Sequence, residues 1–190
     1  MKLLAIFLCA FSFLVSGQAA AAPQDVKGWQ GYSWGMTGEQ IARIGGSEIT
    51  RGERWWPPKR EFYVEYAGPT MRLQDMTFSV RMHMDPKTET LSEIRIVDSA
   101  PALGQVAPQR AKFDQLEALL TQKYGPAQLR TDLDESRDRV MPSVAFARTW
   151  AFPTTTIELR HDWFRSPAGD SAGSITIRYF PTKNSDSGKL

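Results

Sequence analysis

Residues 108–126 constrain the fold most, because this segment has the features of a helix at nearly every position. Apolar side chains recur in it at intervals of three and four residues, which places them on one stripe of a helix. They are Phe113, Leu116, Leu119, Leu120 and Tyr124. Pro108 suits a first helical position, and Gly125 before Pro126 is typical of a helix end with a left-handed glycine. A helix with one apolar stripe must bury it, so we expect strands on either side to form a sheet against it.

A second, shorter helix is predicted over residues 38–44. Thr37 and Gln40 have the spacing of a capping box, in which each residue binds the other's backbone N–H. Met36 and Ile41 have the spacing of a hydrophobic staple across the same helix start. Two glycines follow residue 44 and predict the end of the helix.

Apolar and polar side chains alternate in several other segments, as expected for half-buried strands. The predicted strands are 62–66, 76–84, 91–97, 144–152, 157–163 and 175–179. Residues 47–61 are expected to be irregular, Gly68-Pro69 to turn the chain, and the charged run 130–139 to be a solvated loop. Arg148 is an exception on the apolar side of its strand. The predicted fold class is α+β: an antiparallel sheet of about six strands with two helices on one face, in two α-β-β-β halves.

Residues 1–22 have the pattern of a secretory signal peptide. Lys2 precedes an uncharged apolar run that is too short to span a bilayer, and several alanines follow it. Its removal also removes Cys9, the single cysteine, so the exported chain is expected to carry no disulfide and no stable membrane anchor. We therefore expect a periplasmic or secreted protein with one α+β domain at 23–182 and a disordered tail at 183–190.

Several short motifs occur in a recognisable order: Trp34-Gly35-Met36-Thr37 at a helix start, Lys123-Tyr124-Gly125-Pro126 at a helix end, and the strand motifs Ile157-Glu158-Leu159 and Ile177-Arg178-Tyr179. With these motifs the chain resembles a loose class of small exported bacterial proteins of unknown function. The element order is also similar to the helix-plus-sheet modules of outer-membrane assembly lipoproteins and of secreted β-lactamase inhibitor proteins. The chain lacks the lipid-bearing cysteine of the former and the disulfides of the latter. The resemblance implies a binding or structural role and no particular site residue.

Catalytic patterns in the sequence are incomplete. Residues 169–173 match Gly-x-Ser-x-Gly, but no histidine follows them, so a hairpin loop is expected. His83 and His161 lack the spacing of a metal-ligand pair, and His161 is expected to be a hydrogen-bonded residue at the core edge. Glu158 and Asp162 lie on one side of a strand and offer an alternative acid–base pair. No metal and no cofactor is predicted.

The segment Trp55-Trp56-Pro57-Pro58, flanked by Arg54 and Arg60, is the feature that folding explains least. Exposed aromatic side chains beside arginine are enriched at interaction surfaces, so Trp55, Trp56, Arg54 and Arg60 are the predicted binding residues. The alternative is that both indoles fold back over the short helix and cover it. A formal net charge of +2 gives no reason to expect nucleic acid. The predicted function is a non-catalytic binding protein, envelope-associated or inhibitory, whose partner is an envelope protein or a cell-wall component. The alternatives are a small periplasmic hydrolase and a carrier of a small apolar ligand in a groove between sheet and helices.

Overall fold

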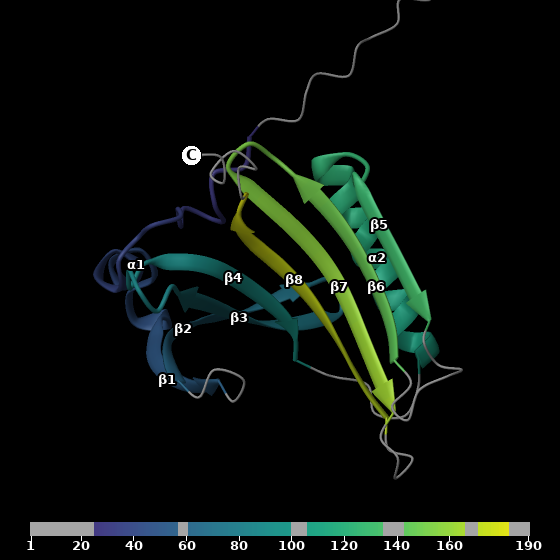
Figure 1. The fold of residues 1–190 in the computed structure, drawn as a ribbon, viewed down its shortest axis with the longest axis horizontal. Coiled ribbons are helices and arrows are strands. Elements are labelled where there is room, and N and C mark those ends of the chain that lie inside the picture. The colour runs from purple at the N-terminus through teal and green to yellow at the C-terminus, as the bar shows by residue number, and fades with distance from the viewer. Residues whose placement is uncertain (1–24, 57–60, 100–105, 135–142, 166–170, 183–190) are drawn as a thin grey trace, which may run out of the picture.

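The computed structural model is α+β, with one antiparallel sheet of eight strands and two α-helices, and it describes residues 25–56, 61–99, 106–134, 143–165 and 171–182 (Figure 1). The elements in chain order are α1 (Gly38–Gly45), the short 3-10 helix η1 (Gly46–Glu48), β1 (Thr50–Trp56), β2 (Glu61–Leu73), β3 (Met76–Met84), β4 (Leu91–Asp98), α2 (Val106–Tyr124), β5 (Leu129–Asp134), β6 (Ser143–Ala151), β7 (Thr155–Arg165) and β8 (Ser171–Pro181). The predicted signal peptide and the tail at 183–190 lie outside the described residues, as do Gly169 and Asp170. Among the described residues, no helix combines the length and the apolar character needed to cross a membrane.

The sheet is built from two similar halves. Each half has one α-helix followed by four strands, and the strand order is β1-β2-β3-β4-β8-β7-β6-β5. The halves therefore join where β4 pairs with β8, in the centre of the sheet. Figure 1 shows the first half running across the view and the second half running diagonally beside α2. Each half has one strand more than the predicted α-β-β-β unit.

Helix α1 begins and ends at the residues that its caps dictate. The Thr37 backbone N–H donates to Gln40 Oε1 at 2.8 Å, and the Gln40 N–H donates to Thr37 Oγ1 at 3.4 Å, so the predicted capping box is present. Gly46 has a φ of +56° and its N–H bonds to the Ala42 carbonyl, which ends the helix. The one fully buried residue of α1 is Ile41.

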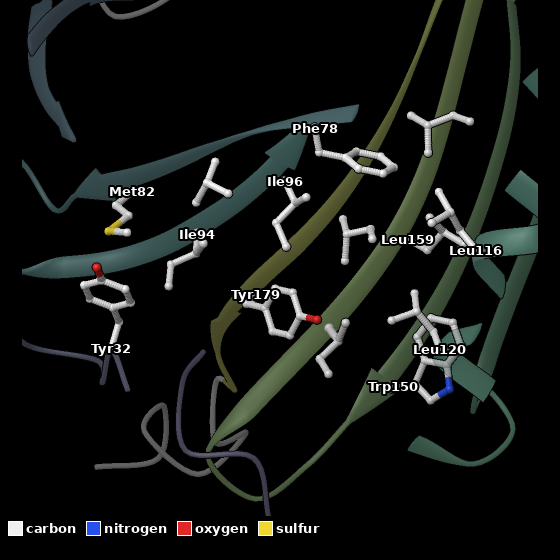
Figure 2. Close-up of a cluster of buried hydrophobic side chains, with 14 of the residues drawn as sticks. Tyr32, Phe78, Met82, Ile94, Ile96, Leu116, Leu120, Trp150, Leu159 and Tyr179 are labelled. Carbon is white, nitrogen blue, oxygen red and sulfur yellow. The ribbon is translucent and has the colours of Figure 1, made fainter. Parts of the chain in front are cut away.

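Helix α2 buries the predicted stripe. Phe113 and Leu116 are fully buried, and Leu120 and Tyr124 are almost so. The helix begins at Val106, two residues before the predicted start. Figure 2 shows Leu116 and Leu120 near Leu159 and Trp150, which belong to β7 and β6.

Both helices contact the same face of the sheet. Directly opposed residues continue this face across the strands, from Tyr66 through Met82, Ile94, Tyr179 and Ile157 to Trp150. A Cβ built on Gly38 of α1 would lie 1.9 Å from the Tyr66 hydroxyl oxygen, so α1 starts against this row. The Tyr124 hydroxyl of α2 lies 3.5 Å from that of Tyr179, in the same row.

The prediction of about six strands is wrong because both edge strands were missed. β1 lies in the segment expected to be irregular, and β5 lies in the expected solvated loop. The described side chains of both strands are mostly exposed, so neither shows the alternation that a half-buried strand gives. Charged side chains such as Arg51 and Glu53 suit an edge, because they discourage pairing with another chain.

The prediction that Gly68-Pro69 turns the chain is also wrong. β2 runs through it for 13 residues, and its pairing with β3 shifts register between Ala67 and Thr70. A proline cannot donate to the ladder and is tolerated where pairing is irregular, as it is at a bulge. The turn comes later, at Gln74 and Asp75.

Replacing Gly125 with valine should destabilise the protein by roughly 1–2 kcal/mol, the cost of left-handed backbone for an ordinary residue. Gly125 has a φ of +80°, and a Cβ there would meet nothing within 4 Å, so the loss would be conformational rather than steric. Gly125→Asn is the matched control, because asparagine adopts this conformation more readily. Urea unfolding measures both variants; equal stability of the two would contradict the left-handed cap as the cause.

Candidate functional site: an arginine-lined groove

The face of the sheet opposite the helices carries a row of arginines. Arg81 on β3 is directly opposed to Arg95 on β4, and Arg95 is opposed to Arg178 on β8. Val80, Ile96 and Ile177 are next to them in sequence and face the core instead, because successive strand residues point to opposite faces. Like charges that face each other across strands destabilise a sheet, so this row requires carboxylates close to the arginines.

A groove of about 680 Å³ lies over this row and crosses the joint between the two halves of the sheet. Its lining residues are Arg54, Arg81, His83, Arg95, Val97, Arg160, Asp162, Thr176 and Arg178. They come from β1, β3, β4, β7 and β8, so the groove exists only when both halves are assembled. We call it the arginine groove.

Carboxylates lie beneath the guanidinium groups. Arg81 Nη1 donates to Glu65 Oε1 at 2.6 Å, and Arg95 Nη2 donates to Glu93 Oε2 at 2.8 Å. The side chains of Glu65 and Glu93 are 8% and 13% exposed, whereas those of Arg81 and Arg95 are 31% and 35% exposed. A molecule that approaches these two pairs would therefore meet guanidinium groups before carboxylates. The carboxylate of Asp162 also lines the groove; its side chain is 45% exposed and pairs with Arg160.

Glu93 sits between two arginines. Burial by itself would raise the pKa of Glu93, but hydrogen bonds from Arg95 and Arg178 lower it below its ordinary value. Arg178 Nε donates to Glu93, and Arg178 Nη1 donates to Glu158 Oε2 at 2.7 Å. Glu93 is thus an ionised group that holds two arginines in place from below.

Among the described residues, these ion pairs use only some of the N–H donors of the groove arginines. A guanidinium has five N–H donors. Among the described residues, the carboxylates take one nitrogen each of Arg81 and Arg95 and two of Arg178. Arg95 Nε is buried and has no hydrogen-bond partner there. The groove can therefore offer hydrogen bonds to a further group with several acceptor oxygens.

His83 lines the groove and is neutral at pH 7. Its side chain is 9% exposed, and its Nε2 lies 3.5 Å from Glu65 Oε2. Burial, followed by the positive charge of Arg95, lowers the pKa of His83 from 6.5 to about 4. Its ring stacks on Tyr63 with centroids 5.3 Å apart.

The structure places one predicted binding residue in the groove. Arg54 is half exposed, and its Nε lies 3.8 Å from Glu65 Oε1. Trp55 and Trp56 continue β1 beyond Arg54, opposed to Phe62 and Glu61, and their side chains lie outside the description. Arg60 lies outside the described residues altogether.

The residues considered for hydrolysis do not form one site. His161 lies on the helix face, stacked on Phe146 at 5.8 Å, whereas Glu158 and Asp162 lie on the opposite face of β7 and pair with arginines. His161 was expected to hydrogen bond at the core edge; it is instead fully buried, and neither ring nitrogen has a partner among the described residues. Burial lowers its pKa. The described residues also contain no group of three potential metal-ligating side chains.

The sequence contains a signal for the groove that the period of its apolar residues does not reveal. Arg81, Arg95, Arg160 and Arg178 each stand between two inward-facing residues on their strand. One arginine at the outward position of each of four strands marks a shared face once the strands are placed side by side. No protein-family pattern, curated protein or solved structure matches this chain, so its resemblance to small exported proteins stays a prediction.

Proposed function

We propose that this protein is an exported, non-catalytic binding protein whose arginine groove binds an acidic component of the cell envelope. The observation that carries the proposal is the layer of partly exposed guanidinium groups above buried carboxylates, with donors left unused. Arginine presents a planar fork of donors that matches carboxylate and phosphate oxygens. The groove volume of about 680 Å³ lies within the range of ligand sites, roughly 300–1,000 Å³.

The predicted Trp55–Trp56 surface fits this function as a flank of the groove. Both residues follow Arg54 on the same edge strand. Edge strands and their ends are accessible to a partner, and aromatic side chains add apolar contact beside charged ones. Arg60, four residues after Trp56 in the sequence, belongs to the same proposed surface.

Arg95→Gln tests the function most cleanly. It removes the central arginine of the row and leaves Glu93 paired with Arg178, so folding should be preserved. Hydrogen bonds to charged groups contribute about 1.5–3 kcal/mol, so citrate binding should weaken roughly 10- to 100-fold. Arg43→Gln on α1 is the matched control, because it removes the same charge from an exposed position outside the groove. Isothermal titration with citrate and with inorganic phosphate measures both variants, and equal binding by the two would overturn the assignment of the groove.

The two histidines of the chain provide an internal comparison by NMR. A bound anion should raise the pKa of His83, because it would oppose the nearby positive charge of Arg95 and Arg54. His161 lies on the opposite face of the sheet and should keep its pKa. Equal shifts of both histidines, or none at saturating citrate, would place the anion elsewhere.

A further inference from the structure

A second cavity lies on the helix face of the sheet, away from the arginine groove. It has a volume of about 310 Å³ and lies between α2, the end of β2, strands β4 and β8, and the turn that carries Trp29. We call it the helix pocket. Figure 2 shows the sheet residues Ile96 and Tyr179 and the helix residues Leu116 and Leu120 that contribute to its walls.

The helix pocket has a physical origin in the width of the sheet. Eight strands at about 4.8 Å spacing are roughly 34 Å wide. Two helices, each about 10 Å in diameter, cover about 20 Å of that width. α2 packs on β7 and β8, and α1 starts against Tyr66 of β2, so the strip between them has no described helix above it. Trp29 and Tyr32, whose rings stack at 6.3 Å, lie in the turn beside this strip.

The residues that line the helix pocket are mostly apolar, and one of them is charged. Met71 on β2 and Leu119 on α2 both line the pocket, and both are half-buried. Lys123, in the last turn of α2, is the one charged residue of the lining. Its Nζ lies 5.0 Å from the Tyr124 ring centroid, and no carboxylate among the described residues pairs with it. The pocket thus combines an apolar interior with an unpaired ammonium group at an exposed position.

We propose that the helix pocket binds a single-chain fatty acid, with the acyl chain against the apolar walls and the carboxylate near Lys123. The apolar lining selects the chain, because burying each methylene is favourable. The lone ammonium selects an anionic head by charge complementarity. This assignment goes beyond the proposed function and is independent of the arginine groove, since the two cavities lie on opposite faces and share no residue.

A chain-length series measures the depth of the helix pocket. Binding of saturated fatty acids by the purified full chain is followed by isothermal titration, from hexanoate upwards and below their micelle concentrations. Affinity should rise about fourfold with each added methylene until the pocket is filled, and then level off. An affinity that does not depend on chain length would overturn the proposal, as would an affinity that never levels off, which would indicate detergent-like adsorption on the surface.

Three variants locate the ligand. Leu119→Phe should fill the pocket and weaken decanoate binding at least tenfold, and Met71→Phe on β2 should do the same if the first variant does not fold. Lys123→Gln should weaken decanoate roughly two- to fivefold, the factor that an exposed ion pair supplies, and leave decanol binding unchanged. Lys87→Gln, an exposed turn lysine outside the pocket, is the charge control.

The outcomes separate this site from the arginine groove. Arg95→Gln should leave decanoate binding intact, and Lys123→Gln should leave citrate binding intact. Full decanoate affinity in both Leu119→Phe and Met71→Phe would overturn the helix pocket as the site, whatever happens in the groove. Equal loss of decanoate and decanol in Lys123→Gln would overturn the placement of the carboxylate.

Discussion

Replacing Arg148 with alanine should lower the free energy of unfolding by about 3–5 kcal/mol, the cost of removing one partner of a buried ion pair. The Arg148 side chain is 1% exposed. Arg148 is the charged exception among the apolar residues at the inward positions of β6. Its Nε donates to Glu117 Oε2 at 2.8 Å, and its Nη1 donates to Asp132 Oδ1 at 2.7 Å. Arg148 therefore ties α2 to β5 and β6 from inside the protein.

The loss in Arg148→Ala would come mainly from Glu117. This carboxylate is 14% exposed, so the variant would leave it buried with only Arg130, whose side chain is 59% exposed, as a partner. Arg130→Ala is the matched control and should cost no more than about 1 kcal/mol, as exposed ion pairs do. Urea unfolding with a constant m-value measures both.

A double variant tests whether an unpaired buried charge causes the loss of stability in Arg148→Ala. Arg148→Met combined with Glu117→Leu removes both buried charges and should recover most of the stability, because no unpaired group remains. A loss below about 1 kcal/mol in Arg148→Ala would contradict a structural role for the pair. Failure of the double variant to recover stability would mean that packing around the Arg148 stem matters more than charge.

Acidification should destabilise the protein between pH 6.5 and about 4, and His83 should account for up to roughly 3 kcal/mol of the loss. Burial keeps His83 neutral in the folded protein, so its pKa falls from 6.5 to about 4. Between these values the unfolded chain binds a proton that the folded protein does not. The free energy of unfolding therefore decreases as the pH decreases through this interval, and it is unaffected by His83 above it.

The charges around His83 set the size of this effect. Arg95 and Arg54 lower the pKa of His83, whereas Glu93 and Glu65 raise it, so burial remains the dominant cause. His83→Gln should flatten the pH dependence of urea unfolding across the interval. His161→Gln should also reduce the pH dependence of urea unfolding, independently of His83, because burial also lowers the pKa of His161. An unchanged slope in His83→Gln would contradict the neutral state of this residue.

Local signals in the sequence determined the elements whose side chains alternate or repeat against the core. The capping box at Thr37 and the glycine at Gly125 define helix ends through backbone geometry, which depends on neighbouring residues only. β3 and β4 alternate buried and partly exposed side chains over most of their length, so a period of two was visible in the chain. The α+β class followed from these elements.

Tertiary structure decided the edges of the sheet and brought together the residues of both candidate sites. β1 and β5 are strands because their neighbours β2 and β6 offer them hydrogen bonds, and no apolar pattern of their own predicts them. Arg54, Arg81, Arg95 and Arg178 belong to four strands, and the joining of β4 to β8 brings Arg178 beside Arg95. Strand order depends on long-range pairing, which no local stretch of sequence encodes. The helix pocket likewise exists because eight strands are wider than the two helices that cover them.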